Sequence, residues 1–159
     1  MSPREHYFVK DWMSQRGLSI SKDVSLKEAV QIMIREKTNG LVVTEDDKVV
    51  GIVSSWDLIR HVVPDYLEDE GGSLGSFEAE PEFAKRAQQV AEDKVEKLMT
   101  KNVHTVKPDD TLMEAATMLS EHGIRQLPVV DDNFKLIGYI NRTDLKAAIG
   151  DVLDIINKK

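Results

Sequence analysis

Two aspartates stand at positions where a carboxylate can bind the hydroxyl groups of a ligand. Asp57 lies three residues after Ser54, and Asp144 lies three residues after Asn141, each in the first turn of a predicted helix. A carboxylate can accept hydrogen bonds from both vicinal hydroxyls of a ribose, and such charge-assisted bonds are stronger than neutral ones. The helix dipole also favours a negative charge in the first turn. Capping of its own helix is the alternative role for each aspartate.

The residue types around these aspartates would suit the rest of a nucleotide. Free backbone N–H groups at a helix start attract phosphate. Hydroxyl or amide side chains stand at both helix starts, namely Ser54, Ser55, Asn141 and Thr143. Adenine needs a flat apolar slot, and the predicted strands offer walls for it at Leu18, Leu41, Val42, Val53, Val103, Leu127, Pro128 and Ile140.

An internal repeat relates the two aspartates. The segment from Trp12 to Val62 aligns with the segment from Leu98 to Ile149. Met99 follows Met13 by 86 residues, and Asp144 follows Asp57 by 87, because the second copy gains one residue after an acidic turn. Similarity at a fixed spacing indicates that one structural unit occurs twice.

Each copy predicts the element order β-α-β-β-α. Capping-box sequences at Ser25–Glu28 and Thr111–Glu114 open the first helix, and apolar residues recur after them at helical spacing. Two β-prone runs around an acidic turn then predict a hairpin. A second helix is expected from about Trp56 and from about Thr143. Each copy should therefore form a three-stranded sheet covered by helices.

The expected fold class is α/β (α+β), with two pseudo-symmetric repeats packed sheet to sheet. A sheet with helices on one side leaves a face that the second copy can cover. We assign residues 10–63 to the first repeat, 64–94 to an acidic loop and linker helix, 95–150 to the second repeat and 151–159 to a tail. The linker helix is expected over 82–97. The tail carries an apolar stripe at 152–156 that needs a partner surface.

The repeated motifs resemble those of CBS domains, and the tandem resembles a Bateman module. The sequences Gly51-Ile52-Val53-Ser54-Ser55-Trp56-Asp57-Leu58 and Gly138-Tyr139-Ile140-Asn141-Arg142-Thr143-Asp144-Leu145 are similar to the family's glycine-to-aspartate element. Gly123-Ile124-Arg125-Gln126-Leu127-Pro128 is similar to its strand entry. The resemblance runs from Trp12 to Ile149 apart from the linker.

The resemblance implies a regulatory function without catalysis. Tandem CBS modules typically bind AMP, ADP or ATP, and sometimes S-adenosylmethionine or NAD, in two clefts between the repeats. An adenine nucleotide would then be a regulatory ligand and not a catalytic cofactor. Such modules often form homodimers through their helices. Further ligand contacts are implied at Ser19, Asn39, Gly40, Thr100, Thr105, Arg125 and Gln126, several of which could equally be ordinary strand, turn or surface residues.

The two copies depart from one another at the predicted site. The second has Asn141 where the first has Ser54, and the first has Asn39-Gly40 where the second has Arg125-Gln126. We therefore expect the two clefts to differ in affinity, and one can be empty.

Composition excludes several other classes of protein. The 159 residues carry 28 acidic and 21 basic side chains, a net charge of −7 that opposes binding to nucleic acid. The absence of cysteine excludes disulfides and thiolate chemistry. No apolar run approaches the ~18 residues of a membrane span, so a cytoplasmic protein is expected. The four histidines form no metal-ligand pattern, although His104 could reach a bound nucleotide.

Two functions from different classes remain open on the sequence. The favoured one is a sensor of an adenosine-containing ligand that acts on an unknown partner protein. The alternative is an adaptor that uses the repeats as a dimerisation scaffold with vestigial clefts. A small hydrolase or kinase is disfavoured, because the sequence has neither a P-loop nor a supported general base.

Overall fold

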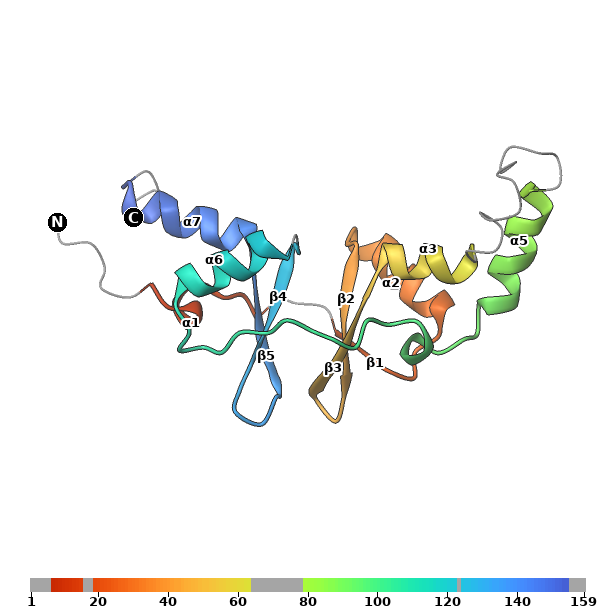
Figure 1. Cartoon of the computed structure of the whole chain (residues 1–159), viewed down its shortest axis with the longest axis horizontal. Helices are drawn as coiled ribbons and strands as arrows, with labels where there is room; N and C mark the ends of the chain where they lie inside the picture. Colours follow the sequence, from red (N-terminus) through yellow and green to blue (C-terminus); the bar gives the residue numbers. More distant parts are fainter. Residues whose placement is uncertain (1–6, 16–18, 64–78, 123, 155–159) are drawn as a thin grey trace. The chain divides into compact units, whose positions relative to one another are not determined.

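The structure is a computed structural model that describes residues 7–15, 19–63, 79–122 and 124–154. They form a mixed α/β fold, as the sequence predicts, divided into two units (Figure 1). The first-repeat unit contains Ser19–Glu45 and Val50–Val103, and the second-repeat unit contains Met1–Leu18, Asp46–Val49 and His104–Lys159. Of the features predicted above, Leu18, Gly123, residues 64–78 of the acidic loop and residues 155–159 of the tail lie outside the described residues.

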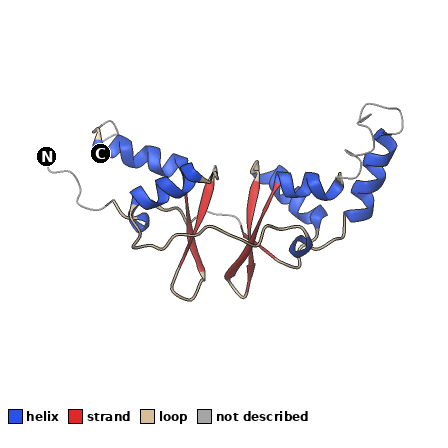
Figure 2. Cartoon of the chain, in the orientation of Figure 1, coloured by secondary structure: helices blue, strands red, loops and turns tan. Residues whose placement is uncertain are grey.

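The first repeat has the predicted order of elements. These are β1 (Ser19–Ser21), α2 (Leu26–Glu36), β2 (Gly40–Glu45), β3 (Lys48–Ser54) and α3 (Ser55–Val62) (Figure 2). Strand β1 pairs in parallel with β2, and the sheet order is β1-β2-β3. Since β3 leads directly into α3, the end of the β2-β3 hairpin places Asp57 in a helical first turn.

Helix α2 forms because its apolar residues lie on one face. Leu26, Ala29 and Met33 are buried, whereas the intervening positions are largely exposed. The Ser25 hydroxyl accepts a bond from the N–H of Glu28 at 3.1 Å, which caps one of the free donors. Among the described contacts, this bond is the only half of the predicted capping box that forms, and the same holds for Thr111 at the start of helix α6 (Leu112–Glu121).

The second repeat is built on a smaller sheet than predicted. Its elements are α6 (Leu112–Glu121), β4 (Gln126–Val130), β5 (Leu136–Asn141) and α7 (Arg142–Val152), and among its described residues only β4 and β5 form a sheet. The expected third strand is reduced to Val106, which bridges to Val129. Pro108 follows two residues later and has no N–H with which to extend the ladder. The prediction of three strands is therefore correct for the first repeat and wrong for the second.

The segment that precedes each repeat, its leading segment, packs on the sheet of the other repeat. Helix α1 (Val9–Trp12) and its flanks lie in the second-repeat unit, where Ser14 exchanges two backbone hydrogen bonds of 2.8 Å with Tyr139. In the first-repeat unit, Thr100 pairs with Ile52 of β3 in the same way. Val9 is fully buried in the core of its unit, and so is Val95 in the other unit. This exchange places the residues that precede one repeat beside the helix start of the other.

The linker helix is shorter than expected. Helix α5 spans Ala79–Val90, and a separate 3-10 turn, η1, spans Val95–Lys97. A turn at Ala91 and Glu92 ends α5. The Arg86 guanidinium of α5 donates to the carbonyl oxygens at the end of α3, at 3.2 Å from that of His61.

Candidate ligand-binding sites

The Asp57 carboxylate is almost fully engaged by its own chain. Its side chain is buried, with 8% exposed, in the first turn of α3. Oδ2 accepts hydrogen bonds from the backbone N–H of Ser54 at 2.8 Å and from the Ser54 hydroxyl at 3.0 Å. The same hydroxyl accepts from the Asp57 N–H at 3.2 Å, which completes a reciprocal capping box. The capping role is therefore real for Asp57.

The second oxygen of Asp57 is also occupied. The Thr100 hydroxyl donates to Oδ1 at 3.3 Å, and the guanidinium of Arg60 lies 3.8 Å from the same atom. Thr100 was predicted as a ligand contact. It is 43 residues from Asp57 in sequence, and the structure brings its hydroxyl directly to this carboxylate. A ligand hydroxyl would have to share or replace these contacts.

The Asp144 carboxylate forms the equivalent capping box but keeps one oxygen open. Oδ2 accepts from the backbone N–H of Asn141 at 2.9 Å, and the Asp144 N–H donates to Oδ1 of Asn141 at 3.1 Å. Within the described parts of the chain, Oδ1 of Asp144 has no hydrogen-bond or ion-pair partner. Burial raises the pKa of this carboxyl, and the Asn141 N–H lowers it by a smaller amount. A partly desolvated carboxylate with a spare acceptor is suited to bind a ligand.

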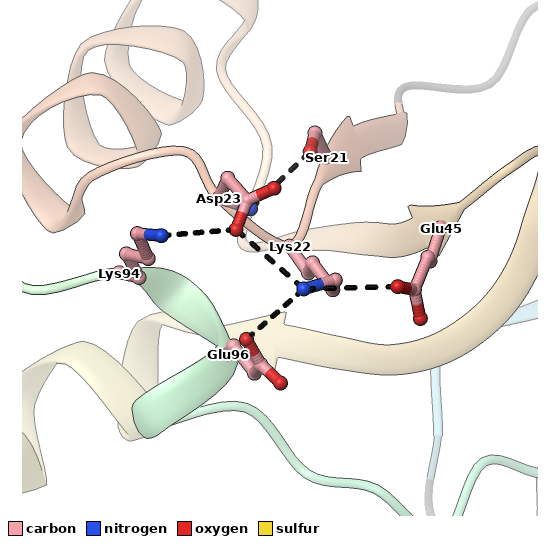
Figure 3. A network of polar contacts seen from close by, with 6 residues as sticks. All are labelled: Ser21, Lys22, Asp23, Glu45, Lys94 and Glu96. Atoms are coloured by element: carbon pink, nitrogen blue, oxygen red, sulfur yellow. Dashed lines mark hydrogen bonds and ion pairs between the residues drawn. The ribbon is translucent and has the colours of Figure 1, made fainter.

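The segment that carries Thr100 is fixed at several points. A Cβ added at Gly51 would lie 2.5 Å from the sulfur of Met99, so the absence of a side chain lets this segment approach β3. Upstream, the Lys22 ammonium lies 3.4 Å from Glu96 and 3.7 Å from Glu45, and Lys94 lies 3.3 Å from Asp23 (Figure 3). These contacts raise the pKa of Lys22, with the hydrogen bond to Glu96 as the largest cause.

Of the predicted residues of the first repeat, Asn39 contacts the start of α3 directly. The Ser55 hydroxyl donates to Oδ1 of Asn39 at 3.1 Å, and the Ser55 N–H donates to the Asn39 carbonyl. Gly40 begins β2 next to them. The proposed adenine walls Leu41, Val42 and Val53 are buried in the sheet, with 3% exposure or less. Ser19 is exposed on β1.

The predicted residues of the second repeat are less closely connected. Leu127, Pro128 and Ile140 are buried strand residues, and Gln126 is partly buried at the start of β4. Arg125 and Thr143 are exposed, and the described contacts give Arg125 no ion pair. Thr105 and His104 are half-buried in a segment without strand pairing, and Val103, also half-buried, belongs to the first-repeat unit.

One histidine contact was not visible in the sequence. The rings of His104 and His122 stack with centroids 3.8 Å apart and planes 12° apart. Parallel rings cannot aim their lone pairs at one metal ion, and the described residues contain no group of three or more potential metal ligands. No spacing rule predicts a contact between residues that come from a loop and a helix end.

A second histidine contact ties the end of α3 to the linker. Nε2 of His61 lies 2.8 Å from Oδ2 of Asp93, with Lys97 4.0 Å from the other oxygen. The hydrogen bond with His61 is the main cause that lowers the pKa of Asp93. This contact was also missed, because the partners are 32 residues apart and join only through the tertiary fold.

We expect the contribution of Asp93 to stability to disappear in acid. A carboxyl whose folded-state pKa is lowered stabilises the fold above its ordinary value of 3.8, and this contribution is lost as the pH falls through the lower folded-state value. Asp93→Asn should lower the free energy of unfolding at pH 7 by about 1 kcal/mol, since the pair is partly exposed. Urea unfolding at pH 7 and below pH 3.8 would measure this difference, which should shrink in acid. A difference that stays constant with pH would contradict the prediction.

Comparison with known proteins identifies the family. The model of the CBS domain matches residues 9–64 and 95–151. Homoserine O-acetyltransferase of Methanohalobium evestigatum is 28% identical over 145 residues, which cover 91% of this chain and 24% of that protein. The chain therefore spans about a quarter of the length of this relative. No described helix has the length and apolar character needed to cross a membrane.

Solved structures with bound adenosine compounds share this fold. CBSX2 of Arabidopsis thaliana in complex with AMP is 29% identical, covers 91% of this chain and 97% of its own, and superimposes with a TM-score of 0.68. The CBS domain pair of protein MJ0100, in complex with 5'-methylthioadenosine and S-adenosyl-L-methionine, is 26% identical. It covers 90% of this chain and 95% of its own, with a TM-score of 0.63. The chain belongs to the CBS-domain family, and its two repeats are two CBS domains.

Proposed function

We propose that this chain binds an adenosine-containing small molecule and acts as a regulatory module without catalysis. The proposal rests mainly on Asp144, whose half-buried carboxylate keeps Oδ1 free of the described hydrogen bonds and so available to hydroxyl donors. A ribose presents two such donors, and a charged acceptor binds them more strongly than a neutral one. The AMP, 5'-methylthioadenosine and S-adenosyl-L-methionine complexes of similar structures support the same class of ligand.

Ligand binding would act on a partner protein through linkage. A ligand that binds the folded chain at ~100 times its dissociation constant stabilises that state by about 2.7 kcal/mol. This free energy is large enough to shift an equilibrium between two assemblies or two partner affinities. AMP-type nucleotides are our first candidates, and S-adenosylmethionine or NAD are the alternatives.

Thermal unfolding with and without ligand tests the proposal. AMP at ~100 times its dissociation constant should raise the Tm by roughly 5–11 °C, from about 2.7 kcal/mol and about 2–4 °C per kcal/mol for a chain of this size. CMP is the matched control, because it offers the same ribose and phosphate without adenine. If AMP, ADP, ATP, NAD, 5'-methylthioadenosine and S-adenosylmethionine all leave the Tm unchanged, the sensor function is wrong.

A dimerisation scaffold is the second candidate, because apolar side chains are exposed on equivalent helices. Trp56 and Ile59 of α3 are 66% and 50% exposed, and Ile149 and Val152 of α7 are 60% and 56% exposed. Such side chains commonly mark an interface. We propose that these helices form a homodimer, which sedimentation equilibrium would detect. Dimerisation without any ligand response would favour the scaffold over the sensor.

A further inference from the structure

The two aspartates occupy equivalent positions but differ in how many donors they already bind. Oδ2 of Asp57 accepts two hydrogen bonds and its Oδ1 accepts a third, from Thr100. Among the described contacts of Asp144, Oδ2 accepts one bond and Oδ1 accepts none. The carboxylates therefore offer very different acceptor capacity to a ligand.

Part of this difference follows from a single change between the repeats. The Ser54 hydroxyl can accept the Asp57 N–H and donate its own proton to the carboxylate at the same time. The Asn141 side chain caps Asp144 through its amide oxygen, which can only accept. The exchange of serine for asparagine thus removes one donor from the second carboxylate.

The rest of the difference comes from the hydroxyl of Thr100. Thr100 is held at β3 by its two backbone bonds with Ile52, 2.8 and 2.9 Å long, and these bonds place its hydroxyl at Oδ1 of Asp57. A hydroxyl is also the group that a ribose would present to the same oxygen. The Thr100 hydroxyl thus makes the hydrogen bond to Asp57 that a ribose hydroxyl would otherwise make.

We infer that the Thr100 hydroxyl is an internal competitor for Asp57, so that an adenosine-type ligand fills the Asp144 site first and the Asp57 site only in competition with Thr100. This inference rests on the proposed function and adds the order of filling and the residue that sets it. The chain would respond to low ligand concentration through one site and to high concentration through the other. Thr100 is thereby a specificity residue that opposes binding, whereas a phosphate or ribose contact from Thr100 would favour it.

Calorimetric titration of the full chain with AMP, in an Asp144→Asn background, isolates the Asp57 site. Thr100→Val removes the hydroxyl with little change in shape and should raise AMP affinity about tenfold, the value of one hydrogen bond to a charged group. Thr100→Ser keeps the hydroxyl and should bind AMP as the background does. Thr100→Ala repeats the test if the valine variant melts early.

The direction in which AMP affinity changes in the Thr100 variants decides whether the inference holds. A tenfold gain in the valine or alanine variant, absent in the serine variant, supports it. Unchanged or weaker binding in both variants, or two equal sites in the wild-type chain, overturns it while the proposed function stands. A wild-type chain that binds none of AMP, 5'-methylthioadenosine and S-adenosylmethionine overturns the proposed function, and the inference falls with it.

Discussion

Asp144→Asn is expected to weaken AMP binding by roughly tenfold to a hundredfold while the fold persists. The neutral amide loses the charge-assisted bonds to ribose, worth about 1.5–3 kcal/mol. Its oxygen can still accept the Asn141 N–H that closes the capping box. Because burial raises the pKa of Asp144, the charged form costs free energy in the folded state, and removal of the charge should not lower the Tm appreciably. Calorimetry and thermal unfolding measure the two effects.

The matched control for this variant is Asp109→Asn. Asp109 is in the same unit, carries the same charge, and its exposed side chain (86%) contacts only Lys10 among the described ion pairs. Loss of the Asp109 charge should change AMP affinity by no more than about twofold from that of the wild type, since an isolated surface ion pair contributes little free energy. Equal affinities for the wild type and both variants would remove Asp144 from the site.

The pH dependence of binding provides a further check on the same residue. Protonation of Asp144 competes with ribose binding, and the raised pKa means that this competition begins at a pH above the ordinary carboxyl value of 3.8. The wild-type affinity should therefore fall on acidification more steeply than that of the asparagine variant. Parallel pH profiles would contradict the role of the carboxylate.

Gly51→Ala is expected to destabilise the first-repeat unit by about 1–3 kcal/mol, which corresponds to a fall in Tm of roughly 2–12 °C. The new Cβ would meet the Met99 sulfur at 2.5 Å and the Thr100 carbonyl oxygen at 3.1 Å. The methionine side chain can move, but the backbone of Thr100 cannot do so without loss of its pairing with Ile52. Thermal and urea unfolding measure the cost.

Gly40→Ala is the matched control for this substitution. The nearest atom to its Cβ would be the Val53 carbonyl oxygen at 3.9 Å, an ordinary contact, and its backbone lies outside the left-handed region. The control should be neutral or slightly stabilising, because alanine reduces the freedom of the unfolded chain. Met99→Ala should recover part of the loss at Gly51, as a double-mutant cycle would show. A Gly51 variant as stable as the Gly40 variant would refute the close-approach explanation.

Local patterns predicted most of the secondary structure correctly. Helix starts at Ser55 and Arg142 lie within one residue of the expected positions, and both hairpins form where acidic turns separate β-prone runs. The capping role of Asp57 was also predictable, because a capping box joins residues only three apart. The prediction of the linker helix was less accurate. Helix α5 ends at Val90, and no local sequence signal marks the point where a charged helix loses its packing.

The sequence by itself determined the repeat, the family and the helical first turns that carry both aspartates, because these depend on short-range spacing and on the similarity of two segments. Tertiary structure alone decided that Thr100 contacts Asp57, that His61 contacts Asp93, and that Val106 makes a bridge and no strand. These contacts join residues that are distant in sequence, and the contact of Thr100 with Asp57 follows from the exchange of leading segments between the repeats. Among the described contacts Oδ1 is occupied in Asp57 and open in Asp144, and this difference therefore depends on the packed chain and not on the repeated motif.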